Sequence, residues 1–334
     1  MIVELPGFFD LQVNGFAGVD FNSPALLPED VCRALDAMRS TGVTRCLPTL
    51  ITSSFDHFAA GARAVLGSGH PAIAGFHMEG PYISPEDGPR GAHRRADVIA
   101  ADADDFARRQ EACAGQIKLV TLAPEIDGAL PLIERLAASG VRVAIGHTAA
   151  SPARIREAIS AGATLATHLG NGCAQMLPRH PNAIWELLAA DEVSASLIVD
   201  GHHLPPSTVK AMVRAKGVAR TILVTDAISA AGCAPGPFQL GEVHCLLGED
   251  GRVSLPGSPY LAGSALTMEK AVENTVHYAG LTLQEAAAMA SRNPAGYLSM
   301  APSGTVIAEW DAGRMALRVA EVRDGPPAAG ILND

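Results

Sequence analysis

The stretch RVAIGHTAASPARIREAISAGATLATHLGN, from Arg142 to Asn171, decides the fold. It holds a short apolar run that ends in a histidine, then an Ala-rich stretch with apolar residues three to four positions apart, then a second apolar run that ends in a histidine. Short apolar runs bounded by polar motifs are typical of buried strands. Apolar residues three to four positions apart, as in the Ala-rich stretch, are typical of an amphipathic helix. The stretch therefore predicts a strand, a helix and a second strand.

The same pattern recurs along the chain, as eight short apolar runs that each end in a motif rich in His, Asp, Glu, Asn or Gln. The runs are Phe8–Gly15, Val43–Ile51, Ala72–Gly80, Ile117–Glu125, Arg142–Thr148, Thr164–Asn171, Ser194–His203 and Thr221–Ala227. Eight strand–helix units close into an α/β fold of the TIM type, a (β/α)8 barrel, which keeps its chemistry at the C-terminal ends of the strands. The polar motifs occupy those ends, so the sequence predicts an enzyme.

Helices are predicted between the runs and after the last one, from apolar residues at helical spacing. They are expected at Pro28–Thr41, Asp102–Gly115, Asp127–Gly140, Pro152–Gly162, Pro205–Gly217, Gly263–Ala279 and Leu283–Arg292. The segment 230–262 is rich in Gly and Pro between short polar–apolar runs, which favours a β-hairpin beside the barrel mouth. We therefore expect a barrel over 1–300 with this insertion, followed by a residual β segment or tail over 301–334.

Composition narrows the classes of function. In the 334 residues, 48% are hydrophobic and 18% are charged, which is enough apolar material for a large core. The net charge is −10, from 25 basic and 35 acidic residues without a Lys/Arg cluster. Nucleic acid and anionic membranes are therefore poor partners, whereas a small anionic substrate remains compatible with a locally positive site.

Cysteine usage and the N-terminal sequence predict a cytoplasmic protein. The six cysteines are scattered and contain no CxxC pair, which favours reduced thiols. The first residues, MIVELPGFFD, have neither a basic segment nor a long apolar run, so a signal peptide is not expected. No stretch approaches 18 uninterrupted apolar residues, so no transmembrane helix is expected either.

Three polar residues end predicted strands three, five and six: Glu79, His147 and His168. One carboxylate and two imidazoles on a rigid rim form a sound site for a divalent metal, with water completing the coordination. Asp226 ends strand eight on the same rim, where a carboxylate can take a proton from water and pass it to a leaving group. An alternative role for Asp226 is to cap the following segment.

Further polar residues fall in the loops after the strands. His93 and His203 can each donate a hydrogen bond to a substrate carbonyl or hydroxyl. His202 is expected to be structural or to support the residues that contact the substrate. Asn171 and Gly172 follow His168, where backbone N–H groups can hold an anion, and Arg179 would add a charged fork suited to phosphate.

Together the motifs resemble the N-acetylglucosamine-6-phosphate deacetylase family of the amidohydrolase superfamily. The matching pieces, from Pro6 to about Asn293, are PGFFDLQVNGFAGVDFN, HMEGPYISPEDGPRGAH, TLAPE, GHTAAS, THLGNG, DGHH, LVTDA and LAGSALTMEKAV. The resemblance implies a homodimeric enzyme that hydrolyses N-acetylglucosamine 6-phosphate to glucosamine 6-phosphate and acetate, through a metal-activated water.

The resemblance also implies the roles of particular residues. It makes Glu79, His147 and His168 the metal ligands, Asp226 the general base and acid, and His93 a contact of the acetamido carbonyl. The implied substrate and phosphate contacts are Ala92, Asn171, Gly172, Arg179, His203, Leu261, Ala262 and Gly263.

The first predicted strand carries Gln12 and Asn14 where most amidohydrolases have a His-x-His pair that binds a second metal. Amides are weaker ligands than imidazole for a transition metal. We therefore expect one divalent metal ion per subunit, Zn²⁺ in the first place, while Fe²⁺, Mn²⁺ and Co²⁺ suit the same ligands.

The chain departs from the family pattern at two places. It begins only a few residues before PGFFD, so the family's small β-sandwich is expected to be reduced or absent. The loop Gly170–Cys173 lacks the usual aromatic-Asn-Ala-Met pattern, and His-Pro-Asn follows Arg179 instead of Glu-Pro-Gly. Two alternatives therefore stay open: a deacetylase of another N-acyl amino sugar (the galactosamine 6-phosphate analogue or an unphosphorylated sugar), and a non-catalytic barrel that binds sugar phosphates.

Overall fold

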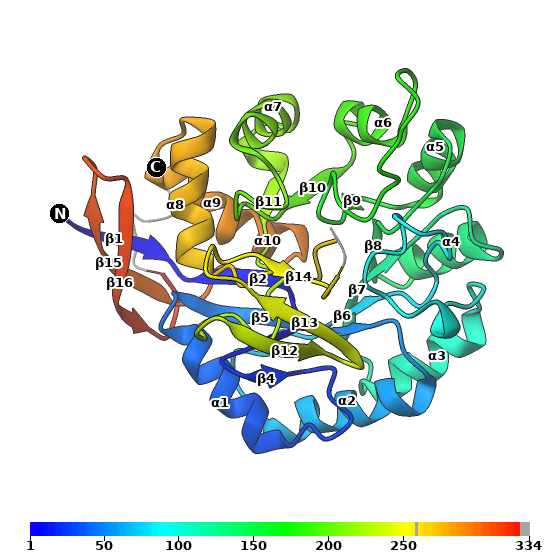
Figure 1. Cartoon of the computed structure of the whole chain (residues 1–334), viewed down its shortest axis with the longest axis horizontal. Helices are drawn as coiled ribbons and strands as arrows, with labels where there is room; N and C mark the ends of the chain where they lie inside the picture. Colours follow the sequence, from blue (N-terminus) through cyan, green and yellow to red (C-terminus); the bar gives the residue numbers. More distant parts are fainter. Residues whose placement is uncertain (258–259, 328–334) are drawn as a thin grey trace.

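The computed structural model describes residues 1–257 and 260–327. Its centre is a sheet of eight parallel strands in the order β11-β10-β9-β8-β7-β6-β5-β2, surrounded by helices (Figure 1). The two end strands meet at the mouth, because Asp226 donates its backbone N–H to Gln12 and Asn14 donates its own to Ala227. The predicted (β/α)8 barrel is confirmed.

Each barrel strand lies inside one of the eight predicted runs. The strands are β2 (Phe8–Val13), β5 (Val43–Ile51), β6 (Phe76–Glu79), β7 (Ile117–Leu122), β8 (Arg142–Ile145), β9 (Leu165–Ala166), β10 (Ser194–Leu197) and β11 (Thr221–Leu223). All except β5 end before the run does. The polar motifs therefore leave the ladder and turn over the barrel mouth.

The helices pack around the outside of the barrel. They are α1 (Pro28–Arg39), α2 (Phe55–Ser68), α3 (Ala103–Ala112), α4 (Ala129–Ala138), α5 (Pro152–Ala161), α6 (Ala183–Ala189), α7 (Pro206–Lys216), α8 (Met268–Ala279), α9 (Leu283–Ala290) and α10 (Arg292–Tyr297), with 3-10 turns η1 (Arg95–Asp97) and η2 (Val218–Arg220). Seven match predicted helices, although α8 begins five residues later than expected because the segment from Gly263 lies at the barrel mouth.

Helices α2, α6 and α10 were not predicted. Gly61 and Gly67 weaken the helical signal of α2, but a side chain at Gly61 would approach Leu50 of β5 to 3.1 Å. Glycine at this position lets α2 pack closely on the barrel. Helix α6 has only seven residues and is capped by Asn182, whose side chain accepts a hydrogen bond from the backbone of Trp185.

Three smaller sheets accompany the barrel. Strands β12 (Gly236–Leu240), β13 (Val243–Leu247) and β14 (Val253–Ser254) form an antiparallel sheet within the Gly/Pro-rich segment, and β3 (Gly15–Phe16) pairs with β4 (Val19–Asp20). The sheet β12–β14 has its own apolar cluster, which includes Ile51 and Leu240. This cluster seats the sheet at the barrel mouth.

The two ends of the described chain share the third small sheet, in the order β1-β15-β16 (Figure 1). Strand β1 (Ile2–Pro6) pairs antiparallel with β15 (Thr305–Asp311), and β15 pairs with β16 (Ala316–Arg323). Residues 2–6 were placed with the barrel in the predicted division at residue 300, but they pair with the C-terminal segment instead. The expected tail over 328–334 lies outside the described residues.

Among the residues that the structure describes, no helix is long and apolar enough to cross a membrane.

Candidate metal centre and active site

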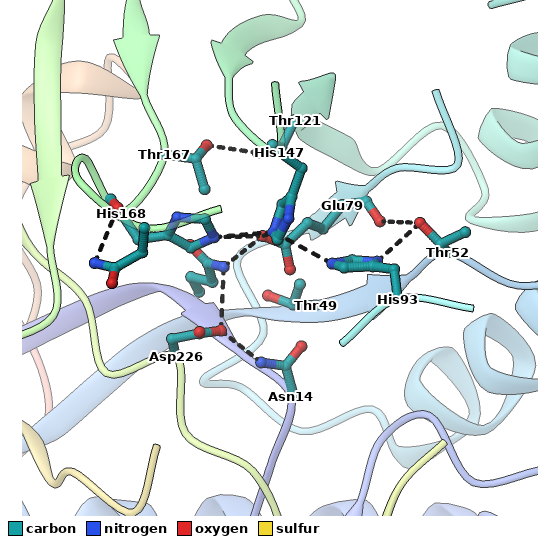
Figure 2. Close-up of polar contacts among 12 residues, drawn as sticks. Asn14, Thr49, Thr52, Glu79, His93, Thr121, His147, Thr167, His168 and Asp226 are labelled. Carbon is teal, nitrogen blue, oxygen red and sulfur yellow. Dashed lines mark hydrogen bonds and ion pairs between the residues drawn. The ribbon is translucent and has the colours of Figure 1, made fainter. Parts of the chain in front are cut away.

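Glu79, His147 and His168 converge at the barrel mouth (Figure 2). Glu79 ends β6, and the two histidines follow β8 and β9 by two residues each. Oε1 of Glu79 lies 3.1 Å from Nε2 of His168 and 3.3 Å from Nε2 of His147, and the two Nε2 atoms are 3.1 Å apart. All three side chains are buried. The structure therefore brings together the three predicted metal ligands.

The protonation of these groups suits a divalent cation. Nδ1 of His147 lies 2.9 Å from the carbonyl oxygen of Pro89, to which it donates when the ring is neutral. This bond fixes the tautomer and leaves the Nε2 lone pair facing the centre. In the metal-free protein a protonated Nε2 of His147 can instead donate to Glu79, as can Nε2 of His168. Burial alone would raise the pKa of Glu79, but these hydrogen bonds hold it well below its usual value, so the carboxylate is charged. One carboxylate and two imidazole nitrogens, all aimed at one point, fit a site for zinc or a similar metal.

The backbone at this centre is strained. His147, His168 and Asp226 have φ angles of 50°, 31° and 49°, in the left-handed region that residues with a side chain rarely adopt. Such conformations persist where the surrounding structure holds them, and they cluster at functional sites. Each of these residues follows a barrel strand by two or three positions, and the turn directs its side chain into the mouth.

Asp226 is held by two amide side chains, Gln12 and Asn14. They occupy the positions at the first barrel strand where most amidohydrolases have a His pair. Nε2 of Gln12 donates to Oε1 of Glu79 at 2.8 Å and to Oδ1 of Asp226 at 3.1 Å. Nδ2 of Asn14 donates to the same Oδ1 of Asp226 at 2.8 Å (Figure 2). Burial and the nearby charge of Glu79 raise the pKa of Asp226 to about 6. The first strand thus supplies hydrogen-bond donors to two carboxylates where a His pair would bind a metal.

His93 lies beside the centre. Its Nδ1 is 2.9 Å from Oγ1 of Thr52, and its Nε2 is 3.3 Å from Nε2 of His147. Burial and the neighbouring His147 lower the pKa of His93 to about 3. The ring is therefore neutral at neutral pH, with one N–H available for a hydrogen bond.

His203 is held by a carboxylate that the sequence did not single out. Oδ2 of Asp200 lies 2.7 Å from Nδ1 of His203, and its Oδ1 accepts the backbone N–H groups of His202 and His203. Burial would raise the pKa of Asp200, but these bonds to His203 lower it. Asp200 is the first residue of the DGHH motif, and its position three residues before His203 could have indicated this pairing. His202 bonds the backbone of Asp250 and does not line the cavity.

The centre opens into a cavity of about 440 Å³, in the size range of small-molecule sites. The predicted contacts Ala92, Asn171, Gly172, His203, Leu261 and Gly263 line it, together with Asn14, the three metal ligands, His93 and Asp226. Ala262 is buried behind this surface. Arg179 is exposed and does not line the cavity.

The loop after His168 packs tightly against the ligands. A side chain at Gly172 would come within 2.9 Å of Nδ1 of His147, and its φ of 57° favours glycine. Asn171 bonds the carbonyl oxygen of His168 through its own side chain. The cavity also includes Cys173, Gln175 and apolar residues that no sequence motif indicated, because only the fold of the loop brings them to the site.

The amidohydrolase family model matches residues 3–313. The chain is 33% identical over 324 residues to N-acetylglucosamine-6-phosphate deacetylase from Lysinibacillus sphaericus, which covers 92% of this chain and 79% of that protein. It is 34% identical over 312 residues to N-acetylgalactosamine-6-phosphate deacetylase from Shewanella sp. (strain ANA-3), with 91% and 77% covered.

Solved structures are also similar. N-acetyl-D-glucosamine-6-phosphate deacetylase from Mycobacterium smegmatis matches with a TM-score of 0.86 at 31% identity, over 96% of this chain and 86% of that chain. A variant of that enzyme in complex with N-acetyl-D-glucosamine-6-phosphate matches with the same TM-score of 0.86 at 30% identity, over the same shares of the two chains, 96% and 86%.

Proposed function

This chain belongs to the amidohydrolase family, in the branch that holds these amino-sugar phosphate deacetylases, and we propose that it removes the N-acetyl group from N-acetylglucosamine 6-phosphate. The products are glucosamine 6-phosphate and acetate. The observation that carries the proposal is the convergence of Glu79, His147 and His168 beside Asp226 at the mouth of the barrel. A barrel that only binds a sugar phosphate has no use for a proton acceptor at this point.

We assign the three ligand residues to one divalent metal ion, with zinc as the first candidate among the metals that these ligands suit. When bound there, the ion supplies a Lewis acid that polarises the amide carbonyl and lowers the pKa of water. Gln12 and Asn14 donate hydrogen bonds at the first-strand position, which favours a single metal.

Asp226 and His93 carry the proton and the developing charge. The carboxylate of Asp226 takes a proton from the attacking water and returns it to the sugar nitrogen as the C–N bond breaks. Its pKa, raised to about 6 by burial and Glu79, suits a group that must both accept and release a proton near neutral pH. Neutral His93 has one N–H, which it donates to the carbonyl oxygen as negative charge develops there, while Nδ1 accepts from Thr52.

The remaining cavity residues would hold the sugar. His203, fixed by Asp200, and the loop at Asn171 and Gly172 present polar groups to the cavity, whereas Leu261 and Gly263 lie on its wall. Arg179 would reach a phosphate in this cavity only if its loop moved, because its side chain is exposed outside the lining in this structure.

A specific observation keeps an unphosphorylated N-acetyl amino sugar as the second candidate substrate. Within residues 1–257 and 260–327, the lining of the cavity contains neither Lys nor Arg. An anion would then depend on histidine, on amide groups or on a group from outside this cavity. The similarity to an N-acetylgalactosamine-6-phosphate deacetylase adds that phosphate as a third substrate to compare.

The test is release of free amine by metal-loaded protein from four compounds: N-acetylglucosamine 6-phosphate, N-acetylgalactosamine 6-phosphate and the two unphosphorylated sugars. The proposal expects the highest kcat/KM with the first. A higher kcat/KM for either unphosphorylated sugar would transfer the assignment to that sugar, and no release from any of the four by protein with bound metal would refute amino-sugar deacetylation. We further propose a homodimer in the cytoplasm, which size measurement in solution and cell fractionation would test.

A further inference from the structure

A buried layer of polar side chains lies below the candidate metal centre, on the side toward the interior of the barrel. It consists of His77 on β6, Thr121 on β7 and Thr167 directly after β9, which are 0%, 0% and 3% exposed. His77 precedes Glu79 by two residues on the same strand, so the two side chains point to the same side of β6. Polar groups are costly inside a barrel unless they are hydrogen-bonded, and apolar residues usually fill this space.

The three side chains form one hydrogen-bonded chain. Nε2 of His77 lies 2.7 Å from Oγ1 of Thr121, and Oγ1 of Thr121 lies 2.7 Å from Oγ1 of Thr167. Figure 2 shows Thr167 and Thr121 near His147, joined by a dashed line. A threonine hydroxyl can donate one hydrogen bond and accept others, so Thr121 can donate to Nε2 of His77 while it accepts from Thr167.

This layer contacts the backbone beside each metal ligand. Thr167 is the residue before His168, and the carbonyl oxygen of Thr121 accepts the backbone N–H of Gly80, the residue after Glu79. At Gly146, the residue before His147, an added Cβ would come within 2.8 Å of Cγ2 of Thr121 and 2.8 Å of Cβ of Thr167. The two threonines thus fill the space that a side chain at position 146 would occupy.

The ligands need such support. His147 and His168 adopt φ angles of 50° and 31°, and a left-handed turn at a residue with a side chain persists only where its neighbours hold it. A hydrogen bond fixes the rotamer and direction of each threonine, whereas valine in the same place would only fill volume. The layer therefore offers directional contacts at the point where the strained turns begin.

We propose that Thr121 and Thr167, hydrogen-bonded to His77, are positioning residues that hold the turns of His147 and His168 in the geometry that binds the metal. The inference rests on the metal site of the proposed function. It adds that the affinity for the metal depends on hydroxyl groups that do not contact the metal.

The experiment measures the affinity for Zn²⁺ by competition with a chromophoric chelator, together with the melting temperature of the metal-free protein. Thr167→Val keeps the shape of the side chain and removes only its hydroxyl, which ends the hydrogen-bonded series from His77 through Thr121. Thr167→Ser keeps the hydroxyl. Thr275→Val is the matched control, since Thr275 is 0% exposed and its hydroxyl bonds the carbonyl oxygen of Ala271 within α8, away from the mouth.

We expect Thr167→Val to weaken Zn²⁺ binding by about 10- to 100-fold, as loss of a group that orients a ligand does. Thr167→Ser and Thr275→Val should stay within about twofold of the wild type, and the melting temperatures of the metal-free Thr167→Val and Thr275→Val proteins should be similar. Thr121→Val provides a second reading if Thr167→Val does not fold.

Zn²⁺ binding by Thr167→Val and Thr121→Val within about twofold of the wild type would overturn the inference and leave the metal site intact. Equal weakening in Thr275→Val would also overturn it, because the effect would then follow general stability. Wild-type protein that binds no divalent metal would instead refute the metal site of the proposed function.

Discussion

Replacement of Asp226 by Asn isolates the proton transfer. The carboxylate is buried and accepts hydrogen bonds from Nδ2 of Asn14 at 2.8 Å and Nε2 of Gln12 at 3.1 Å, both on Oδ1. An asparagine side chain has nearly the same shape, and its oxygen can accept both bonds. The pocket and the three metal ligands should therefore stay in place while the group loses its ability to take a proton.

The expected magnitude follows from the role. Loss of a positioned general base and acid costs about 10²- to 10⁴-fold in rate. At about 1.4 kcal/mol for each factor of ten, this equals about 3 to 5 kcal/mol of transition-state stabilisation. The loss should fall on kcat, because the substitution leaves the shape of the cavity and the residues that bind the sugar unchanged.

The assay is acetate release at saturating N-acetylglucosamine 6-phosphate, with metal content and substrate affinity measured on the same preparations. Asp20→Asn is the control, since Asp20 is also buried but lies outside the lining of the cavity. Its kcat should stay close to that of the wild type. An Asp226→Asn enzyme that retains its metal and works at a near-normal rate would refute the role of Asp226 in proton transfer.

Three further predictions concern pH and the substrate. Asp226 must be ionised to take a proton, and its pKa is raised to about 6 in the metal-free protein. We therefore expect kcat/KM to fall as the pH decreases below about 6, or below a lower pH when a bound cation lowers this pKa. A rate that rises on acidification would contradict this. Asp200→Asn should raise KM about tenfold with kcat almost unchanged, because Asp200 orients His203 at 2.7 Å and does not touch the reacting bond; a loss confined to kcat would show that His203 acts in the chemical step. Arg179→Ala should raise KM for the phosphorylated sugar and leave the unphosphorylated sugar unaffected, whereas an equal effect on both would remove Arg179 from phosphate binding.

The barrel could be predicted from the sequence because its strands are read locally. Each apolar run is bounded by a polar motif, and the parallel arrangement places all such motifs at one end. This reasoning alone brings Glu79, His147 and His168 together, although they are far apart along the chain. Helix α2 could not be predicted in the same way. Its Gly61 weakens the local helical pattern, and the reason for a glycine there is the close contact with β5, which the local sequence does not show.

Pairings between distant residues could not be predicted. Strand β1 finds its partner β15 about 300 residues later, and nothing in its own five residues specifies that pairing. Gln12 and Asn14 were interpreted only as replacing a His pair that binds a second metal. Their hydrogen bonds to the carboxylates of Glu79 and Asp226 depend on the tertiary fold. For the same reason His77 received no role, since its partners come from other strands.

The most direct test of the account is acetate release from N-acetylglucosamine 6-phosphate by one preparation in three states: as purified, after removal of metal by a chelator, and after addition of one equivalent of Zn²⁺. The account predicts that activity disappears with the metal and returns with about one ion per chain. Full activity in the metal-free protein, or a protein that binds the ion and releases no acetate, would contradict it.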